Sequence, residues 1–162
     1  MPEFPPRSRA GRWARGLLAG VAVTAFAGAA LAEKPVFTHP FDGAPIDTPL
    51  EAGEKSTPAL EKFKETGENP YRGQPDALAA GKKLYDEWCQ VCHAADATGK
   101  MGPSLVGNKH VYAQTATDAG MFAVVYAGAS GAMQPFGGRI PQDDILKIIA
   151  YVRSLDKQAA AR

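Results

Sequence analysis

The sequence predicts a mainly α-helical protein with an irregular N-terminal extension. Apolar residues recur at helical spacing in three segments, 76–90, 118–126 and 141–155. No segment shows the sustained alternation of apolar and polar residues that is typical of a half-buried strand. Residues 33–75 instead contain seven prolines and four glycines, so we expect most of this stretch to be irregular.

The first 32 residues have the composition of a targeting segment. Arginines at positions 7, 9, 12 and 15 precede the apolar stretch 17–30, and Ala30 and Ala32 supply the small residues that a signal peptidase reads. We therefore predict a signal peptide that is cleaved after Ala32 and directs the chain to the periplasm. A single-pass membrane anchor is the alternative, but the apolar run is short for a bilayer span and rich in alanine and glycine.

Cleavage would leave 130 residues, which is enough for one modest domain. The remaining chain would carry 14 basic and 16 acidic side chains, a net charge of −2. Because nucleic-acid-binding domains are usually strongly basic, this charge argues against a nucleic acid partner.

One short helix is predicted within the extension. Ser56 or Thr57 can cap this helix, and Pro58 suits its first turn. Leu60 shares a face with Phe63, and Gly67 can end the helix. We expect the extension to pack on the domain rather than form a flexible linker, because it contains several large apolar side chains that are costly to leave in water. These are Val36, Phe37, Phe41, Phe63 and Tyr71.

Segment 76–90 is predicted to be a helix with Asp76 as its cap. A glycine inside a helix costs about 1 kcal/mol relative to alanine, so Gly81 indicates a close approach by another element. We expect that element to be the last helix, with Tyr151 packed across Gly81. The residues spaced for one face of the segment are Leu78, Gly81, Leu84, Tyr85 and Trp88.

Segments 118–126 and 141–155 are predicted to be two further helices. Thr115 or Thr117 can cap the first, whose inward face would carry Met121, Phe122 and Val125. The second begins at a proline, has two acidic residues in its first turn and shows apolar residues at i, i+3, i+4 and i+7. These residues are Pro141, Asp143, Asp144, Ile145, Ile148, Ile149 and Val152.

Cys89, Cys92 and His93 form a pattern that is typical of covalent haem attachment. Two thiols three positions apart suit the two vinyl groups of haem, and the adjacent imidazole would be the proximal ligand of the iron. We therefore predict one haem c, bound through both cysteines. The alternatives fit less well: a disulfide would close a short, strained ring, a zinc site would lack a second pair of ligands nearby, and a thioredoxin-like pair would need a βαβ context.

The sixth ligand of the iron separates an electron carrier from a haem enzyme or gas binder with an open site. We predict Met133 as this ligand, because it lies in a loop about 40 residues after His93, where backbone flexibility would let its thioether reach the distal face. Phe136 could then seal the crevice.

Four other side chains are alternatives to Met133 in principle. His110 would give a bis-histidine haem of lower potential, and His39 or an open site are further alternatives. Met121 is expected in the core. Met101 follows His93 too closely in the sequence to cross easily to the opposite face of the haem.

The haem motif, residues 102–105, the methionine loop and residues 148–152 together resemble a class I cytochrome c. The resemblance covers residues 76–157 and implies helices around one covalently bound haem. It also implies that the Pro103 carbonyl accepts a hydrogen bond from the His93 ring, which orients the ring and increases its basicity. One departure is that Gln134 separates Met133 from Pro135, whereas the family often places proline directly after the methionine.

Residues 60–71 and 117–122 give a narrower resemblance, to the cytochrome c(L) family. It implies a periplasmic one-electron carrier rather than an enzyme. Its donor would be a dehydrogenase for methanol or another alcohol that uses pyrroloquinoline quinone (PQQ), and its acceptor a small class I cytochrome c. The alternatives are a generic class I cytochrome c that serves a different dehydrogenase or oxidase, and an open-site haem enzyme such as a peroxidase.

These inferences divide the chain into four parts. Residues 1–32 would be a cleaved signal peptide, and residues 33–75 a Pro/Gly-rich extension with one short helix. Residues 76–157 would form the haem domain and residues 158–162 a C-terminal tail. No stable membrane insertion is expected after cleavage.

Overall fold

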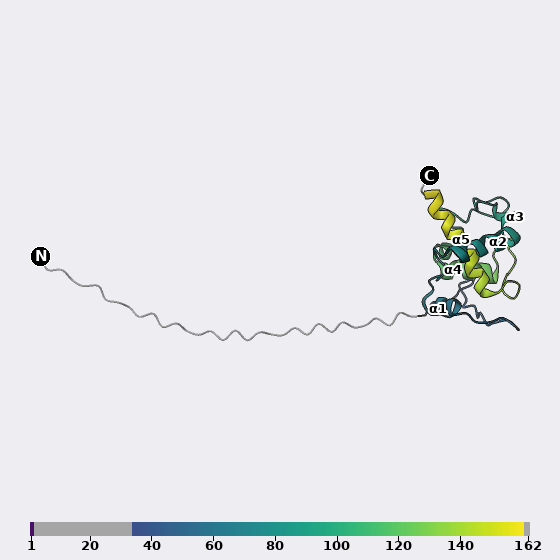
Figure 1. The fold of residues 1–162 in the computed structure, drawn as a ribbon, viewed down its shortest axis with the longest axis horizontal. Helices are drawn as coiled ribbons and strands as arrows, with labels where there is room; N and C mark the ends of the chain where they lie inside the picture. The colour runs from purple at the N-terminus through teal and green to yellow at the C-terminus, as the bar shows by residue number, and fades with distance from the viewer. Residues whose placement is uncertain (2–33, 161–162) are drawn as a thin grey trace. The chain divides into compact units, whose positions relative to one another are not determined.

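Helices dominate the computed structural model, which describes residues 34–160 and Met1 (Figure 1). The predicted signal peptide lies outside the described residues. Within residues 34–160 the only strand-like pairing is an isolated bridge between Thr38 and Pro45, so the mainly α prediction is confirmed. The elements are α1 Pro58–Thr66, α2 Pro75–Trp88, α3 Gln90–His93, the 3-10 turn η1 Ala113–Ala116, α4 Asp118–Ala127 and α5 Gln142–Ala160.

Helix α1 begins and ends as its sequence predicts. The Thr57 hydroxyl accepts a hydrogen bond from the Leu60 N–H at 3.1 Å, which satisfies one of the free donors of the first turn. Gly67 ends the helix at φ 74°, and its N–H donates to the Phe63 carbonyl at 2.7 Å. Leu60 and Phe63 are both buried, as predicted.

Helix α2 starts one residue earlier than predicted. Pro75 occupies the first helical position, so Asp76 lies in the first turn and is not the cap. The helix also ends at Trp88, before the predicted end at residue 90. At Cys89 the chain tightens, because the Cys92 N–H reaches back only three residues to the Cys89 carbonyl, at 3.2 Å.

Helix α5 begins one residue later than predicted and runs five residues further, to Ala160. Pro141 stands just before the helix, and its carbonyl accepts hydrogen bonds from the Asp144 and Ile145 N–H groups at 2.9 and 3.0 Å. The apolar spacing stops at Leu155, but the lysine, glutamine and alanines that follow are good helix formers. Apolar periodicity therefore marks the buried part of the helix and not its end. Among the residues that the structure describes, no helix is long and apolar enough to cross a bilayer.

Helices α2 and α5 pack against each other (Figure 1), and Gly81 of α2 lies in their contact. A Cβ at this position would lie 2.1 Å from the Lys147 carbonyl oxygen and 3.1 Å from the Tyr151 Cβ. The Tyr85 and Tyr151 rings pack with their centroids 5.5 Å apart beside this contact. The predicted close approach, its partner helix and the place of Tyr151 are confirmed.

Part of the extension belongs to the hydrophobic core. The rings of Phe37 and Phe63 pack on Phe122 of α4, with centroid distances of 5.2 and 5.1 Å. The prediction was wrong for Val36 and Phe41, which are 68% and 56% exposed. Phe37, the next residue, is only 8% exposed, so the burial of one apolar side chain here does not bury its neighbour.

Phe41 lies at a tight turn, where the Gly43 N–H donates to the His39 carbonyl at 3.0 Å and the His39 N–H donates to the Ala44 carbonyl at 2.8 Å. Its ring makes an edge contact with Tyr112, at a centroid distance of 6.3 Å. A side chain at the tip of such a turn covers neighbouring surface rather than entering the core.

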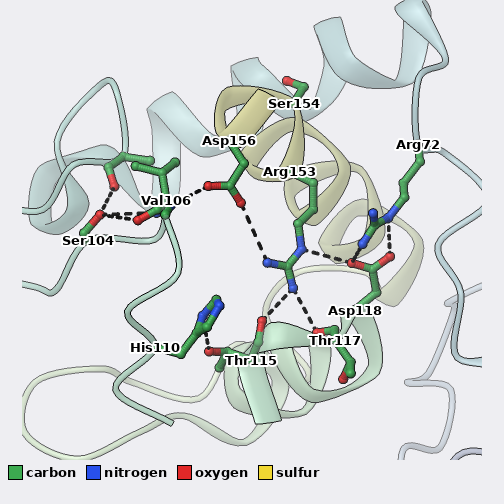
Figure 2. A network of polar contacts seen from close by, with 12 residues as sticks. Arg72, Ser104, Val106, His110, Thr115, Thr117, Asp118, Arg153, Ser154 and Asp156 are labelled. Carbon is green, nitrogen blue, oxygen red and sulfur yellow. Dashed lines mark hydrogen bonds and ion pairs between the residues drawn. The ribbon is translucent and has the colours of Figure 1, made fainter. Parts of the chain in front are cut away.

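A buried ionic cluster joins the extension to the last two helices (Figure 2). Asp118 at the start of α4 accepts two hydrogen bonds of 2.6 Å from Arg72 and one of 3.1 Å from Arg153 of α5. The Asp118 side chain is 3% exposed and that of Arg153 is 9% exposed. Burial by itself would raise the pKa of Asp118, but the hydrogen bonds from the two arginines outweigh it and hold the pKa below its usual value.

We expect Gly81→Ala to lower the free energy of unfolding by about 1–3 kcal/mol, because the new methyl group would meet backbone that cannot rotate away. Urea unfolding of the haem-loaded protein measures the change. Ala79→Gly, at an exposed position of the same helix, is the control and should cost about 1 kcal/mol through helix propensity alone. A Gly81→Ala protein that is more stable than wild type would contradict the close contact.

We expect Asp118→Asn to lower the free energy of unfolding at neutral pH by about 3 kcal/mol, because it removes the carboxylate that pairs with the buried Arg153 at 3.1 Å and leaves only Asp156, at 4.0 Å. A carboxyl whose pKa is depressed by folding stabilises above its unfolded pKa of about 4, and this stabilisation is lost as the pH falls through the folded pKa. The variant should therefore lose less stability than wild type when the pH is lowered below about 4.

Urea unfolding over a series of pH values tests this expectation. Asp86→Asn is the matched control, since Asp86 pairs with Lys82 on the exposed face of α2, and it should have little effect. Parallel pH profiles for wild type and Asp118→Asn would show that the carboxylate contributes nothing to acid stability.

Candidate haem-binding site

The two cysteines and the histidine of the haem motif lie on the short turn that follows α2. The Cys89 N–H donates to the Tyr85 carbonyl at 2.8 Å, and the Cys89 carbonyl accepts from the Cys92 and His93 N–H groups at 3.2 and 3.0 Å. Residues three and four apart on helical backbone share one face. The turn therefore presents two thiols and an imidazole on the same side, which is the arrangement that covalent haem requires.

The His93 ring is fixed by a backbone carbonyl. His93 Nδ1 lies 2.9 Å from the Pro103 carbonyl oxygen, which can only accept, so Nδ1 carries the proton. Nε2 is then left with the free electron pair that a metal needs. The hydrogen bond that the resemblance implied is present, and it sets both the tautomer and the orientation of the ring.

Gly102 is a residue of this site that sequence reasoning missed. A Cβ at Gly102 would lie 2.7 Å from His93 Cε1 and 2.9 Å from Nδ1, so only glycine lets the backbone lie flat against the ring. The Gly102 N–H also donates to the Cys92 carbonyl at 2.9 Å. A glycine before the proline was visible in the sequence, but the ring that it contacts lies nine residues earlier.

Both cysteines are free thiols in this structure. Burial, followed by the proximity of Cys92, raises the pKa of Cys89 to about 12, so at neutral pH it stays protonated. A protonated thiol is a poor nucleophile for disulfide exchange. Within the described residues no group of three or more His, Cys, Asp or Glu side chains could hold a metal ion. Neither the redox-pair nor the zinc alternative gains support.

The loop that carries Met133 connects α4 with α5. It closes on itself through a 3.1 Å hydrogen bond from the Ala129 N–H to the Met133 carbonyl. Gly128, at φ 81°, permits this closure, since a Cβ there would lie 2.9 Å from the Met133 oxygen. The Phe136 N–H donates to the Val125 carbonyl at 3.1 Å, which returns the chain to the end of α4.

Phe136 links the methionine loop to the helix that leads into the haem motif. Its ring meets Trp88 edge-on at a centroid distance of 6.3 Å. The Arg139 guanidinium lies 5.7 Å from the Trp88 centroid and 5.4 Å from that of Phe136. Both rings are partly buried, so this cluster forms one wall beside the haem motif.

The other four candidate ligands of the iron differ in burial and in their contacts. Met121 is buried in the core, as expected, and Met101 is 75% exposed. His110 forms a 3.1 Å hydrogen bond with the Thr115 hydroxyl (Figure 2), and His39 packs against Phe41 at a ring distance of 4.8 Å.

Haem fits the side chains that this site presents. Free thiols at i and i+3 and an imidazole with a free Nε2 at i+4 are the groups that a covalent haem uses, and each is held by the contacts described above. The methionine loop offers a soft thioether as a further ligand, and among the described residues no third thiol competes for the vinyl groups.

Known proteins with related sequences and structures include several cytochromes. The family described as "Cytochrome C oxidase, cbb3-type, subunit III" matches residues 76–152. Cytochrome c-L of Methylorubrum extorquens is 37% identical over 141 residues, which cover 85% of this chain and 72% of the relative.

Two solved structures resemble this one closely. Cytochrome CL from the marine methylotrophic bacterium Methylophaga aminisulfidivorans has a TM-score of 0.72 at 36% identity, over 75% of this chain and 81% of its own. Cytochrome cL from Hyphomicrobium denitrificans has a TM-score of 0.70 at 34% identity, over 74% and 73% of the two chains. These matches confirm the class I cytochrome c fold and support a haem cofactor. The chain belongs to the cytochrome c-L family, whose members carry electrons and are not enzymes.

Proposed function

We propose that this chain is a periplasmic one-electron carrier with a single His/Met-ligated haem c. The observation that carries the proposal is the hydrogen bond between His93 Nδ1 and the Pro103 carbonyl. This bond keeps the proton on Nδ1 and leaves the Nε2 electron pair free to bind iron. When bound, haem supplies an iron that takes up and releases one electron. Cys89 and Cys92 hold it as thioethers.

His93 and Met133 would both ligate the iron. The carbonyl hydrogen bond makes the His93 ring a stronger donor, and the soft thioether of Met133 favours the ferrous state and raises the potential. A carrier works best when its ligands stay in place in both oxidation states. Pro103 and Gly102 hold the His93 ring in place through the carbonyl hydrogen bond and the close backbone contact. Gly128 lets the loop that carries Met133 close on itself.

We infer that the electron donor is a PQQ-dependent methanol or alcohol dehydrogenase and that the acceptor is a small class I cytochrome c. The similarity to cytochrome c-L supports the donor, because its 141 aligned residues extend well beyond the haem domain matched at residues 76–152. One of the related structures comes from a methylotrophic bacterium. Contacts between carriers and their partners are small and short-lived, so neither partner needs a large permanent interface with this chain.

A second candidate function is that of a generic class I cytochrome c that serves a different dehydrogenase or oxidase. It is favoured by the match of residues 76–152 to the family of cbb3-type oxidase subunit III. This match covers only the haem domain, whereas the match to cytochrome c-L covers 85% of the chain. The match along the extension therefore favours the cytochrome c-L function over the second candidate.

The ferric protein should show a sulfur-to-iron charge-transfer band that vanishes in Met133→Ala, and the variant's reduction potential should fall because the thioether is lost. Absorption spectroscopy and redox titration measure both. Met101→Ala is the control, since Met101 is 75% exposed, and it should keep the band. A wild-type protein without the band would refute ligation by Met133.

Stopped-flow reduction should be about tenfold or more faster with a methanol dehydrogenase than with an unrelated quinoprotein donor, because complementary surfaces raise the association rate. The rates should fall as salt is added if charge steers the encounter. Re-oxidation by a cbb3-type oxidase, measured in the same apparatus, tests the second candidate. Equal rates with all donors would count against the methanol dehydrogenase as partner.

A further inference from the structure

The middle of the methionine loop is held by a side chain from another part of the chain. The Tyr112 hydroxyl donates to Ser130 Oγ at 2.7 Å and accepts from the Ser130 N–H at 3.1 Å. In the described part of the chain these are the only hydrogen bonds that residues 130–132 make. Ser130 lies three residues before Met133, inside the turn that the bond from Ala129 to Met133 closes.

Tyr112 itself is firmly placed. Its carbonyl accepts hydrogen bonds from the Thr115 N–H at 3.0 Å and from the Thr115 hydroxyl at 2.8 Å. The Thr115 carbonyl in turn accepts a 2.6 Å hydrogen bond from Arg153, which also binds Asp118 (Figure 2). A continuous series of hydrogen bonds therefore runs from the buried ionic cluster through Tyr112 to the methionine loop.

The extension also contacts the same tyrosine. The Phe41 ring meets the Tyr112 ring edge-on at 6.3 Å. Gln114, two residues after Tyr112, donates through Nε2 to the Thr38 carbonyl at 3.0 Å. Phe41 does not enter the core, but its ring packs against Tyr112, the residue that contacts the loop.

We propose that Tyr112 is a positioning residue that keeps the methionine loop closed, so that Met133 stays on the iron. This inference rests on the proposed ligation by Met133. A single hydroxyl that both donates to and accepts from Ser130 fixes the backbone and the side chain of that residue together. Without it, residues 130–132 are held only through the two ends of the loop, and the thioether leaves the iron more often.

Tyr112→Phe removes both hydrogen bonds but keeps the ring that contacts Phe41. The probe is imidazole, which binds ferric haem only after the methionine has left. We expect its limiting binding rate, followed by stopped-flow absorption of the haem-loaded protein, to rise about fivefold, as for the loss of hydrogen bonds at a partly exposed site. Ser130→Ala removes only one of the two partners and should give a smaller rise.

Tyr71→Phe is the matched control. The Tyr71 hydroxyl donates to Asp143 Oδ1 at 2.8 Å, so this variant also loses a tyrosine hydrogen bond, but one that has no contact with the loop. Its imidazole rate should equal that of wild type. The urea midpoints of all variants are measured in parallel, so that a general loss of stability is separated from local opening.

The possible results separate the two proposals. A charge-transfer band in wild type with a faster imidazole rate only in the Tyr112 and Ser130 variants supports the role of Tyr112. A band in wild type with equal rates in Tyr112→Phe and wild type overturns that role and leaves Met133 as the ligand. No band in wild type overturns both. A Tyr112→Phe rate that rises no more than that of Tyr71→Phe also overturns the role.

Discussion

The buried carboxylate of Asp118 is the point on which the arrangement of this protein depends. It receives Arg72 from the extension and Arg153 from α5, and it stands at the first position of α4. Two arginines around one buried acid would be costly if either oxygen lacked a partner. Here both oxygens are used, and the Asn69 N–H adds a further hydrogen bond at 3.2 Å. Three segments distant in sequence are thereby fixed to one another.

The extension is consequently part of the folded unit that builds the haem site. A second polar cluster, at the N-terminal end of α1, also joins the extension to α5. Asp143 of α5 accepts hydrogen bonds from Thr57 and Tyr71 at 2.5 and 2.8 Å and pairs with Lys147 at 2.9 Å. Thr57 is also the cap of α1, so one residue ends the irregular chain, starts the helix and attaches it to α5. The match to cytochrome c-L covers 85% of the chain, so it includes the extension as well as the haem domain.

Local features of the fold could be predicted from the sequence where the determining atoms are close in sequence. The caps at Thr57 and Gly67 depend on partners within four residues; the sequence predicts Gly67 and narrows the first cap to Ser56 or Thr57. Gly81 is a long-range contact that was still predictable, because an unexplained glycine in a helix implies a neighbour. Asp118 gave no such signal, since an acid after a capping threonine is ordinary in a first turn.

The haem motif was equally local, and the failures of prediction lie where partners come from distant segments. Gly102 contacts a ring nine residues away, and Tyr112 meets Ser130 eighteen residues away across an exposed loop. Hydrophobicity alone also does not predict which apolar residues of the extension are buried. It says that burying Phe37 and Phe41 is favourable, but only the chain direction decides that Phe37 enters the core and Phe41 covers the surface.

The two sides of the proposed iron site are held by different means, and this difference has a physical consequence. His93 lies on helical backbone, with its ring bonded to one carbonyl and packed against Gly102. The methionine side is a loop whose middle depends on the hydroxyl of one partly exposed tyrosine. Backbone packing resists opening more strongly than a hydroxyl that water can replace. Any ligand exchange at this iron should therefore begin on the methionine side, with the histidine side unchanged.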